Sequence, residues 1–227
     1  MKRLALMVAG SALVVVAGAV FVPRALRQIA FFDVRQVELV GLRYSPPGRV
    51  LAVALELGPD RNLFDDHGEL ERRIAALPGV VSARAQRRLP ATLRLVVIER
   101  LPIAFAPGPG GLVPLDGDAR PLPYDPSATG LDLPLVERPD SVLVRTIALV
   151  RASDSLLYHD VDLVRRGADG TVILELGPRQ VLVRAFLTMY DIRAVEAVRR
   201  HLALTGRPYT QLDARYAGWV VVRRGPV

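Results

Sequence analysis

Few residues of this chain have types and spacings that suit catalysis or metal binding. The three histidines, His67, His159 and His201, are far apart, and none has the spacing of a metal-ligand pair. The chain has no cysteine, which excludes disulfides, thiolate metal ligands and thiol catalysis. It also has neither a G-x-S-x-G elbow nor a phosphate-binding loop. We therefore predict no metal site and no cofactor.

Three neighbouring carboxylates, Asp154, Asp160 and Asp162, are the best candidates for acid–base chemistry. We expect Asp160 and Asp162 to share one face of a strand, where like charges normally face solvent. No second carboxylate is placed to act across a groove. The sequence therefore predicts that the protein is not an enzyme. A pocket with perturbed carboxylates would revive the alternative, an anchored extracytoplasmic enzyme.

The chain is basic, with a net charge of +7 and a pI of about 10.5. Every basic residue except Lys2 is an arginine, and the arginines are spread along the chain. No nucleic-acid-binding motif accompanies the charge, so we predict no nucleic-acid partner. The 227 residues, 51% of them hydrophobic, are enough for two small domains with their own cores.

The N-terminus reads as a membrane anchor. Residues 1–3 form a short tail, and residues 4–22 are an uncharged apolar run close to the length that spans a bilayer. Lys2 and Arg3 precede the run, which favours a cytoplasmic N-terminus. The alternative is a cleaved signal peptide, with Ala17-Gly18-Ala19 as the small-residue cleavage pattern. Both interpretations place the rest of the chain outside the cytoplasm.

Residues 32–101 read as strand, helix, helix, strand, strand. A strand is expected from Phe32 to Val40, and a helix follows Ser45-Pro46-Pro47. Asp66 and Glu69 predict a capping box at the start of the second helix. Two alternating strands then flank Pro90, so we predict an antiparallel hairpin.

Residues 102–227 read as a second, mainly antiparallel β domain with two or three helices. Asp116-Gly117 and Asp169-Gly170 each read as a hairpin turn between apolar runs. Helices are expected near 141–153 and 192–203. Strands are expected near 101–105, 111–115, 161–165, 171–176, 181–185, 210–215 and 219–223. The predicted fold class is therefore α+β, with an N-terminal transmembrane helix ahead of both domains.

Several short motifs along the chain resemble one family. The order of the segments and the motifs are similar to those of the FtsQ/DivIB bacterial cell-division proteins: a short tail, one anchor, a polypeptide-transport-associated (POTRA) module and a β domain. The supporting motifs are Val37-Glu38-Leu39-Val40-Gly41, Asn62-Leu63-Phe64, Leu77-Pro78-Gly79-Val80, Arg88-Leu89-Pro90, Thr92-Leu93, Glu99-Arg100-Leu101-Pro102, Val113-Pro114-Leu115-Asp116-Gly117, Leu133-Pro134-Leu135 and Leu212-Asp213-Ala214-Arg215-Tyr216.

This resemblance implies a non-enzymatic scaffold at the division septum, held in the cytoplasmic membrane by one span. The implied partners are the small single-pass coiled-coil proteins FtsB and FtsL, or their counterparts, and other division proteins in the membrane. The scaffold links these proteins to septal wall synthesis. The alternative is a POTRA-bearing factor in polypeptide transport or outer-membrane assembly, a class that usually carries several modules and a barrel region.

The resemblance also implies a contact site on an exposed strand near the C-terminus, to which the partner adds a strand of its own. The expected partner-binding residues are Arg215, Tyr216, Gly218, Trp219, Val220, Val222 and Arg223. The alternative is that Tyr216 and Trp219 only cap the core of the last hairpin. A second docking surface is expected at Arg84, Arg87 and Arg88, which face an acidic partner, anionic headgroups or merely solvent.

Overall fold

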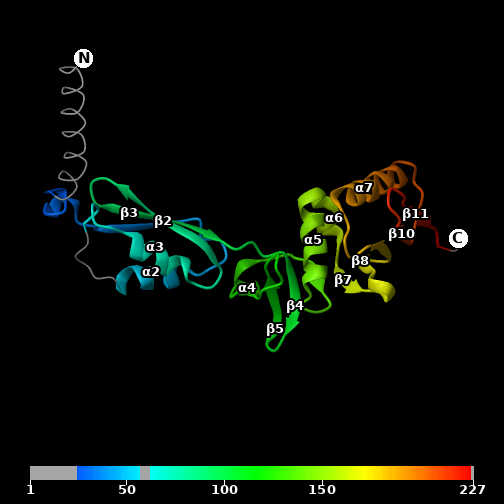
Figure 1. The fold of residues 1–227 in the computed structure, drawn as a ribbon, viewed down its shortest axis with the longest axis horizontal. Helices are drawn as coiled ribbons and strands as arrows, with labels where there is room; N and C mark the ends of the chain where they lie inside the picture. The colour runs from blue at the N-terminus through cyan, green and yellow to red at the C-terminus, as the bar shows by residue number, and fades with distance from the viewer. Residues whose placement is uncertain (1–24, 57–61, 226–227) are drawn as a thin grey trace, which may run out of the picture. The chain divides into compact units, whose positions relative to one another are not determined.

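The computed structural model describes residues 25–56 and 62–225, which form two compact units divided between Glu99 and Arg100 (Figure 1). Among these residues, no helix is both long enough and apolar enough to cross a bilayer. The predicted tail and anchor, residues 1–22, lie outside the described residues.

The N-terminal unit has the predicted order of elements, with one short addition. Its sheet has the order β1-β3-β2, in which β1 runs parallel to β3 and β2 forms an antiparallel hairpin with β3. The elements are η1 (Ala30–Phe32), β1 (Gln36–Val40), α2 (Pro47–Glu56), α3 (Gly68–Ala75), β2 (Val80–Arg88) and β3 (Thr92–Glu99).

Both helices cover the same face of this sheet (Figure 1). Alternate residues of the central strand, Leu93, Leu95 and Val97, are buried, as the period of two in a half-covered strand requires. They pack with Val50 of α2 and with Leu70 and Ile74 of α3. The opposite face of the sheet carries Glu38 and Arg94, joined by two hydrogen bonds of 2.7 and 2.9 Å.

Two local expectations for this unit were wrong. The first strand begins at Gln36 and not at Phe32, because residues 30–32 form the 3₁₀ turn η1. The capping box at Asp66 does not form. Asp66 accepts a hydrogen bond from the backbone of Gly68 (2.9 Å), and Glu69 pairs with Arg72. The carboxylate of Asp66 is used in that tight turn, so α3 starts at Gly68.

The C-terminal unit is one mixed sheet of order β11-β10-β9-β8-β7-β6-β4-β5. Its core packs one face of the central strands, with Val172, Leu174 and Val181 among the buried residues, against α5 and α7. The elements are β4 (Ala104–Gly108), β5 (Gly111–Leu115), α4 (Pro126–Thr129), β6 (Leu135–Val136), α5 (Ser141–Ser153), α6 (Ser155–Asp160), β7 (Leu163–Arg166), η2 (Ala168–Gly170), β8 (Val172–Leu176), β9 (Arg179–Val183), α7 (Met189–Leu204), β10 (Gln211–Ala214) and β11 (Val221–Arg223).

The α+β character with a β-rich second unit is confirmed. The sheet is more mixed than predicted, because β6 lies parallel to both β4 and β7, and β9 lies parallel to β10. The predicted hairpin at Asp169-Gly170 is present between β7 and β8. Asp169 has φ of 55° and Gly170 has φ of 72°, the left-handed pair that a tight hairpin turn requires.

The strand expected from Val161 begins at Leu163, after the unpredicted helix α6. Asp154 caps α6 by accepting a hydrogen bond from the backbone of Leu157 (2.9 Å), and Asp160 is its last residue. Asp160 and Asp162 therefore do not share a strand face, which corrects the sequence-based interpretation. Asp160 pairs with Arg199, and Asp162 accepts a hydrogen bond from the backbone of Gly177 (2.6 Å).

Candidate partner-docking site

Strand β11 lies at one end of the eight-stranded sheet, paired with β10 on one side only among the described strands. The register places Val222 opposite Leu212 and Val221 opposite Asp213. Side chains of a strand alternate between its faces, and here Val220 and Val222 pack against the core. Val221, between them, is 47% exposed. Val220 and Val222 thus hold β11 to its own sheet, while Val221 faces away from the core.

The turn before β11 carries the two large aromatic residues predicted for this site. Tyr216 is 56% exposed and Trp219 is 76% exposed, so neither is a member of the core. The backbone of Trp219 donates a hydrogen bond to the carbonyl of Tyr216 (3.1 Å), which closes the turn. Gly218 has φ of 77°, and a Cβ there would meet no neighbour, so the turn requires glycine for its conformation and not for close packing.

Arg215 is held by its own unit. Its Nε donates to Oδ1 of Asp213 (2.8 Å), and Nη2 donates to Oδ2 (2.6 Å). The hydrogen bond from Arg215 keeps the pKa of Asp213 below its usual value, and the same bond raises the pKa of Arg215. Since Asp213 is almost fully buried, this pair fixes the start of the turn that presents Tyr216 and Trp219. Arg223, at the exposed end of β11, forms no ion pair among the described residues, but its charge contributes to the lowered pKa of Asp213.

A shallow hollow of about 50 Å³ lies between this turn and the start of α7. Sequence reasoning missed Tyr190, which lines the hollow together with Tyr216 and Trp219 and is 81% exposed. Phe186 (87%) and Met189 (44%) are exposed just before and at the start of the same helix. One sequence feature could have indicated exposed apolar residues here. The run Ala185-Phe186-Leu187 precedes the start of a helix and does not continue a strand.

The start of α7 is rigidly defined. Thr188 and Asp191 form a capping box, and Arg184 donates to the Asp191 carboxylate (2.8 Å). Burial opposes ionisation of Asp191, but hydrogen bonds from Thr188 and Arg184 prevail and hold its pKa below the usual value. Tyr190 is therefore presented from a fixed helix end and not from a loose loop.

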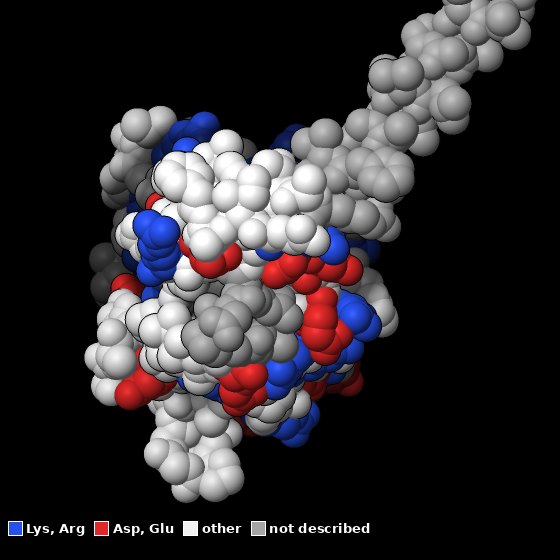
Figure 2. Space-filling model, turned by 90° about the vertical axis from the view of Figure 1, so that its left-hand side faces the viewer, with Lys and Arg blue, Asp and Glu red and all other residues white. Residues whose placement is uncertain are grey.

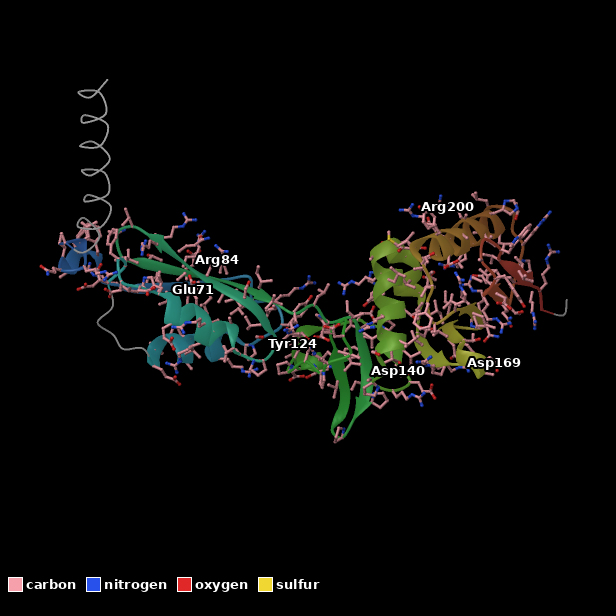
Figure 3. The ribbon with its side chains drawn as sticks, in the orientation of Figure 1. Glu71, Arg84, Tyr124, Asp140, Asp169 and Arg200 are labelled. Carbon is pink, nitrogen blue, oxygen red and sulfur yellow. The ribbon has the colours of Figure 1, made fainter. Side chains whose placement is uncertain are left out.

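The structure separates the three arginines predicted as a second docking surface. Arg84 and Arg88 are exposed on the open face of the N-terminal sheet, where Arg84 is labelled in Figure 3. Arg87 lies on the other face. Its Nε donates to the carbonyl of Leu63 (2.6 Å), and its guanidinium lies 5.6 Å from the centre of the Phe64 ring. Arg87 therefore has a structural role that the sequence did not indicate.

A cavity of about 440 Å³ lies beside α7, and its lining is where a pair of catalytic acids would be expected. Its acids are all engaged: Asp154 caps α6, Asp160 pairs with Arg199, and Glu196 pairs with Arg200, which Figure 3 labels on α7. No pair of free carboxylates faces the cavity, so its lining does not form an acid–base site. No group of histidine and acidic residues in the described chain is arranged to hold a metal ion.

The fold and this site define a two-unit α+β protein with a POTRA module and a β-rich unit that ends in an edge strand. Residues 32–100 match the family model described as "POTRA domain, FtsQ-type". This match covers most of the N-terminal unit, which is therefore similar to POTRA domains of the FtsQ type.

Two curated relatives carry the description "Cell division protein FtsQ". One, from Mycolicibacterium smegmatis, is 31% identical over 157 residues, which cover 60% of this chain and 47% of the relative. The other, from Rhodothermus marinus, is 28% identical over 212 residues, which cover 83% of this chain and 76% of the relative. The match spans about half the length of the mycobacterial protein. These findings confirm the predicted resemblance to the FtsQ/DivIB family.

Proposed function

We propose that this protein is a non-enzymatic scaffold of the bacterial division machinery, and that it docks a partner on strand β11. The similarity to proteins described as cell division protein FtsQ supports the division role. The observation that carries the docking proposal is the edge position of β11 beside three exposed aromatic side chains, Tyr190, Tyr216 and Trp219.

Strand addition suits this edge. The outer side of an edge strand presents unpaired backbone N–H and C=O groups, which an extended partner segment can pair with. Val221 and Arg223 stay exposed on β11, so they are the side chains that contact an added strand. Tyr216 and Trp219 then act as anchors, because large aromatic side chains bury much area at a small entropic cost.

The expected partners are small single-pass division proteins of the FtsB and FtsL type, which this scaffold connects to septal wall synthesis. In this proposal the protein sits in the cytoplasmic membrane by one N-terminal span, with its N-terminus in the cytoplasm and both units outside, at the septum. Arg223 is available to pair with an acidic partner residue, whereas Arg215 is already bound to Asp213.

A pull-down tests the proposal directly. The full chain is captured with the FtsB-like protein of the same organism, alone and with the FtsL-like protein. A Tyr216→Ala, Trp219→Ala variant is compared with a Leu112→Ala, Leu156→Ala control, which removes exposed apolar side chains from β5 and α6 instead. Loss of capture only in the first variant, with an unchanged circular dichroism spectrum, supports docking on β11.

Two other results would contradict the proposal in whole or in part. If the parent chain captures neither partner, the scaffold assignment fails and a polypeptide-transport role becomes the first choice. If both variants retain capture, the division role stands but the docking site lies elsewhere than β11.

A further inference from the structure

One end of the POTRA unit exposes three large apolar side chains. Ile29 is 44% exposed, Phe31 is 58% exposed and Leu89, in the turn between β2 and β3, is 66% exposed. Figure 2 faces the side of the POTRA unit that carries η1 and shows an uncharged area in its upper part, with acidic and basic side chains along the lower border. Exposed apolar residues that gather in one place usually mark an interaction surface.

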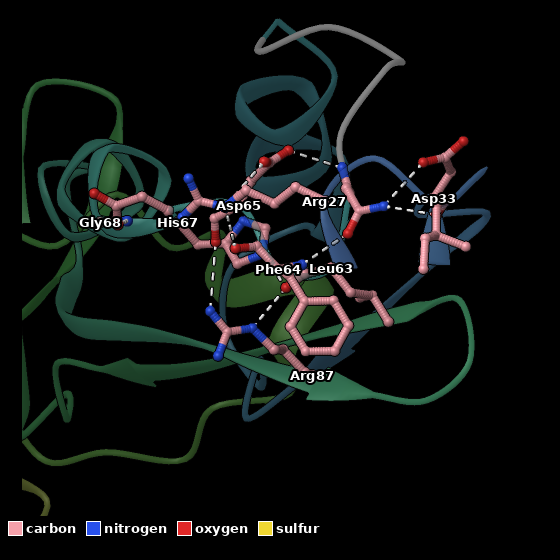
Figure 4. A network of polar contacts seen from close by, with 11 residues as sticks. Arg27, Asp33, Leu63, Phe64, Asp65, His67, Gly68 and Arg87 are labelled. Atoms are coloured by element: carbon pink, nitrogen blue, oxygen red, sulfur yellow. Dashed lines mark hydrogen bonds and ion pairs between the residues drawn. The ribbon is translucent and has the colours of Figure 1, made fainter. Parts of the chain in front are cut away.

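A network of hydrogen bonds connects the segment around Asp33, the segment around Leu63 and Arg87 near the end of β2, although they are far apart in sequence (Figure 4). The backbone of Leu63 donates to the carbonyl of Phe32 (2.9 Å), and Arg87 donates to the carbonyl of Leu63 (2.6 Å). Asn62 also donates to the carbonyl of Ile29 (3.1 Å). The segment around η1 and the end of β2 are therefore tied together through residues 62 and 63, and Leu89 follows two residues after Arg87.

The acidic side chains at this end form hydrogen bonds or ion pairs within the unit, so most of the charge left on its surface is positive. Arg35 and Arg88 are exposed and form no ion pair among the described residues, whereas Arg27 pairs with Asp65. The nearby acids are engaged: Asp33 accepts from Asn62 (3.2 Å), and Asp65 accepts from the backbone of Asn62 (2.8 Å) and lies 3.7 Å from Arg27. Arginines around exposed aromatic and aliphatic residues are the combination that binds an anionic membrane surface.

The sequence indicates that this surface contacts a lipid bilayer. The apolar run of residues 4–22 ends three positions before Ala25, the first described residue, so this end of the POTRA unit is the part nearest the predicted anchor. We propose that Ile29, Phe31 and Leu89 insert into the interface of an anionic phospholipid bilayer, with Arg35 and Arg88 on its headgroups. We call these five residues the membrane-seating surface. Its consequence is that the POTRA unit rests on the bilayer and is not merely tethered to it. The proposal assumes the predicted anchor but needs no division partner.

Trp219 is the only tryptophan, which allows a site-specific test. In a Trp219→Phe background, a tryptophan is introduced as Leu89→Trp, and the full chain is reconstituted into phosphatidylcholine vesicles that contain phosphatidylglycerol and acyl chains brominated near the headgroups. Leu112→Trp, on β5 of the other unit, is the matched control. Position 89 decides the test because residues near 31 stay close to any anchor.

We expect at least about a twofold quenching of the tryptophan at position 89 and little at position 112, since bromine quenches only at contact range. Arg35→Gln with Arg88→Gln is expected to reduce this quenching, while the charge-matched pair Arg145→Gln with Arg193→Gln leaves it unchanged. Both control arginines are exposed and lie on α5 and α7.

Three results would overturn the proposal. An unquenched tryptophan at position 89 in a folded, reconstituted chain shows that the POTRA unit is tethered without resting on lipid. Equal quenching in vesicles of phosphatidylcholine alone removes the role of anionic headgroups. Quenching that appears only after the FtsB-like protein is added shows that the lipid contact depends on the partner and is not a property of the POTRA unit itself. None of these outcomes affects capture of a partner by β11, so the two proposals fail separately.

Discussion

Arg215 binds Asp213 through two parallel hydrogen bonds of 2.8 and 2.6 Å, and this pair stands between the buried end of β10 and the exposed turn at Tyr216. A bidentate pair of this kind restricts the arginine to one orientation. The pair therefore connects the core of the C-terminal unit to the side chains that we propose for partner docking.

Asp213→Ala removes this restraint and leaves the turn at 215–219 less ordered. We expect the dissociation constant for the FtsB-like protein to rise about fivefold, which corresponds to one lost hydrogen bond of about 1 kcal/mol. Isothermal titration calorimetry measures the change. Asp132→Ala, an exposed acid in the loop before β6, is the control, and an equal loss in both variants contradicts the argument.

Trp219→Ala is expected to weaken partner binding by about 2 kcal/mol or more, as for a central aromatic anchor. Its effect on the free energy of unfolding is expected to stay within about 0.5 kcal/mol, because the side chain is 76% exposed. Urea denaturation and a binding titration on the same sample separate the two quantities. A stability loss as large as the binding loss would mean that Trp219 serves the fold.

Gly41→Ala is expected to destabilise the POTRA unit by about 2 kcal/mol or more. Gly41 has φ of 92°, and a Cβ at this position would lie 2.1 Å from the carbonyl oxygen of Val97. Gly48→Ala, in α2, is the matched control because its Cβ would meet nothing within 4 Å. That control is expected to be neutral or stabilising by about 0.5 kcal/mol. Urea midpoints for both variants give the comparison.

Glu99 gives the POTRA unit a pH dependence. Its carboxylate accepts hydrogen bonds from the backbone of Arg43 (2.6 Å), Tyr44 (2.9 Å) and Ser45 (2.7 Å). Burial opposes ionisation, but these bonds prevail and lower the pKa of Glu99 from 4.5. A group with a lowered folded-state pKa stabilises the fold above its unfolded-state pKa and loses that effect as the pH falls.

We therefore expect stability to decline as the pH falls below about 5, the region where an unfolded glutamate begins to bind protons. Glu99→Gln is expected to show a shallower decline and to be less stable than the parent at neutral pH. Urea midpoints between acidic and neutral pH provide the measurement. Parallel curves for parent and variant would contradict the role given to Glu99.

Arg87→Ala is expected to destabilise the POTRA unit by about 1 to 3 kcal/mol, because it leaves the carbonyl of Leu63 without this donor and removes the contact with Phe64. Arg84→Ala, three residues earlier on β2, is exposed and is expected to change stability by less than about 0.5 kcal/mol. Thermal denaturation followed by circular dichroism compares them. Equal changes in stability for the two variants would contradict the structural role of Arg87, which would then stay a predicted docking residue.

The sequence by itself determined the elements whose patterns are local. The alternation of Leu93, Leu95 and Val97 predicted a half-buried strand, and Asp169-Gly170 predicted a hairpin, because both signals depend on neighbouring residues alone. The motif order from Val37 to Pro102 also predicted the POTRA module that the family model matches over residues 32–100. Short strands such as β6 were not predicted from the sequence, because two residues are too few to show a periodicity.

Only the tertiary structure decided which side chains are free. Arg84, Arg87 and Arg88 look alike in sequence, yet Arg87 turns to the carbonyl of Leu63, 24 residues away in the chain. Tyr190 joins Tyr216 and Trp219 only because the start of α7 lies beside the turn before β11. Local patterns state which face of an element is apolar, whereas exposure and pairing depend on contacts between distant segments, and these exist only in the folded chain.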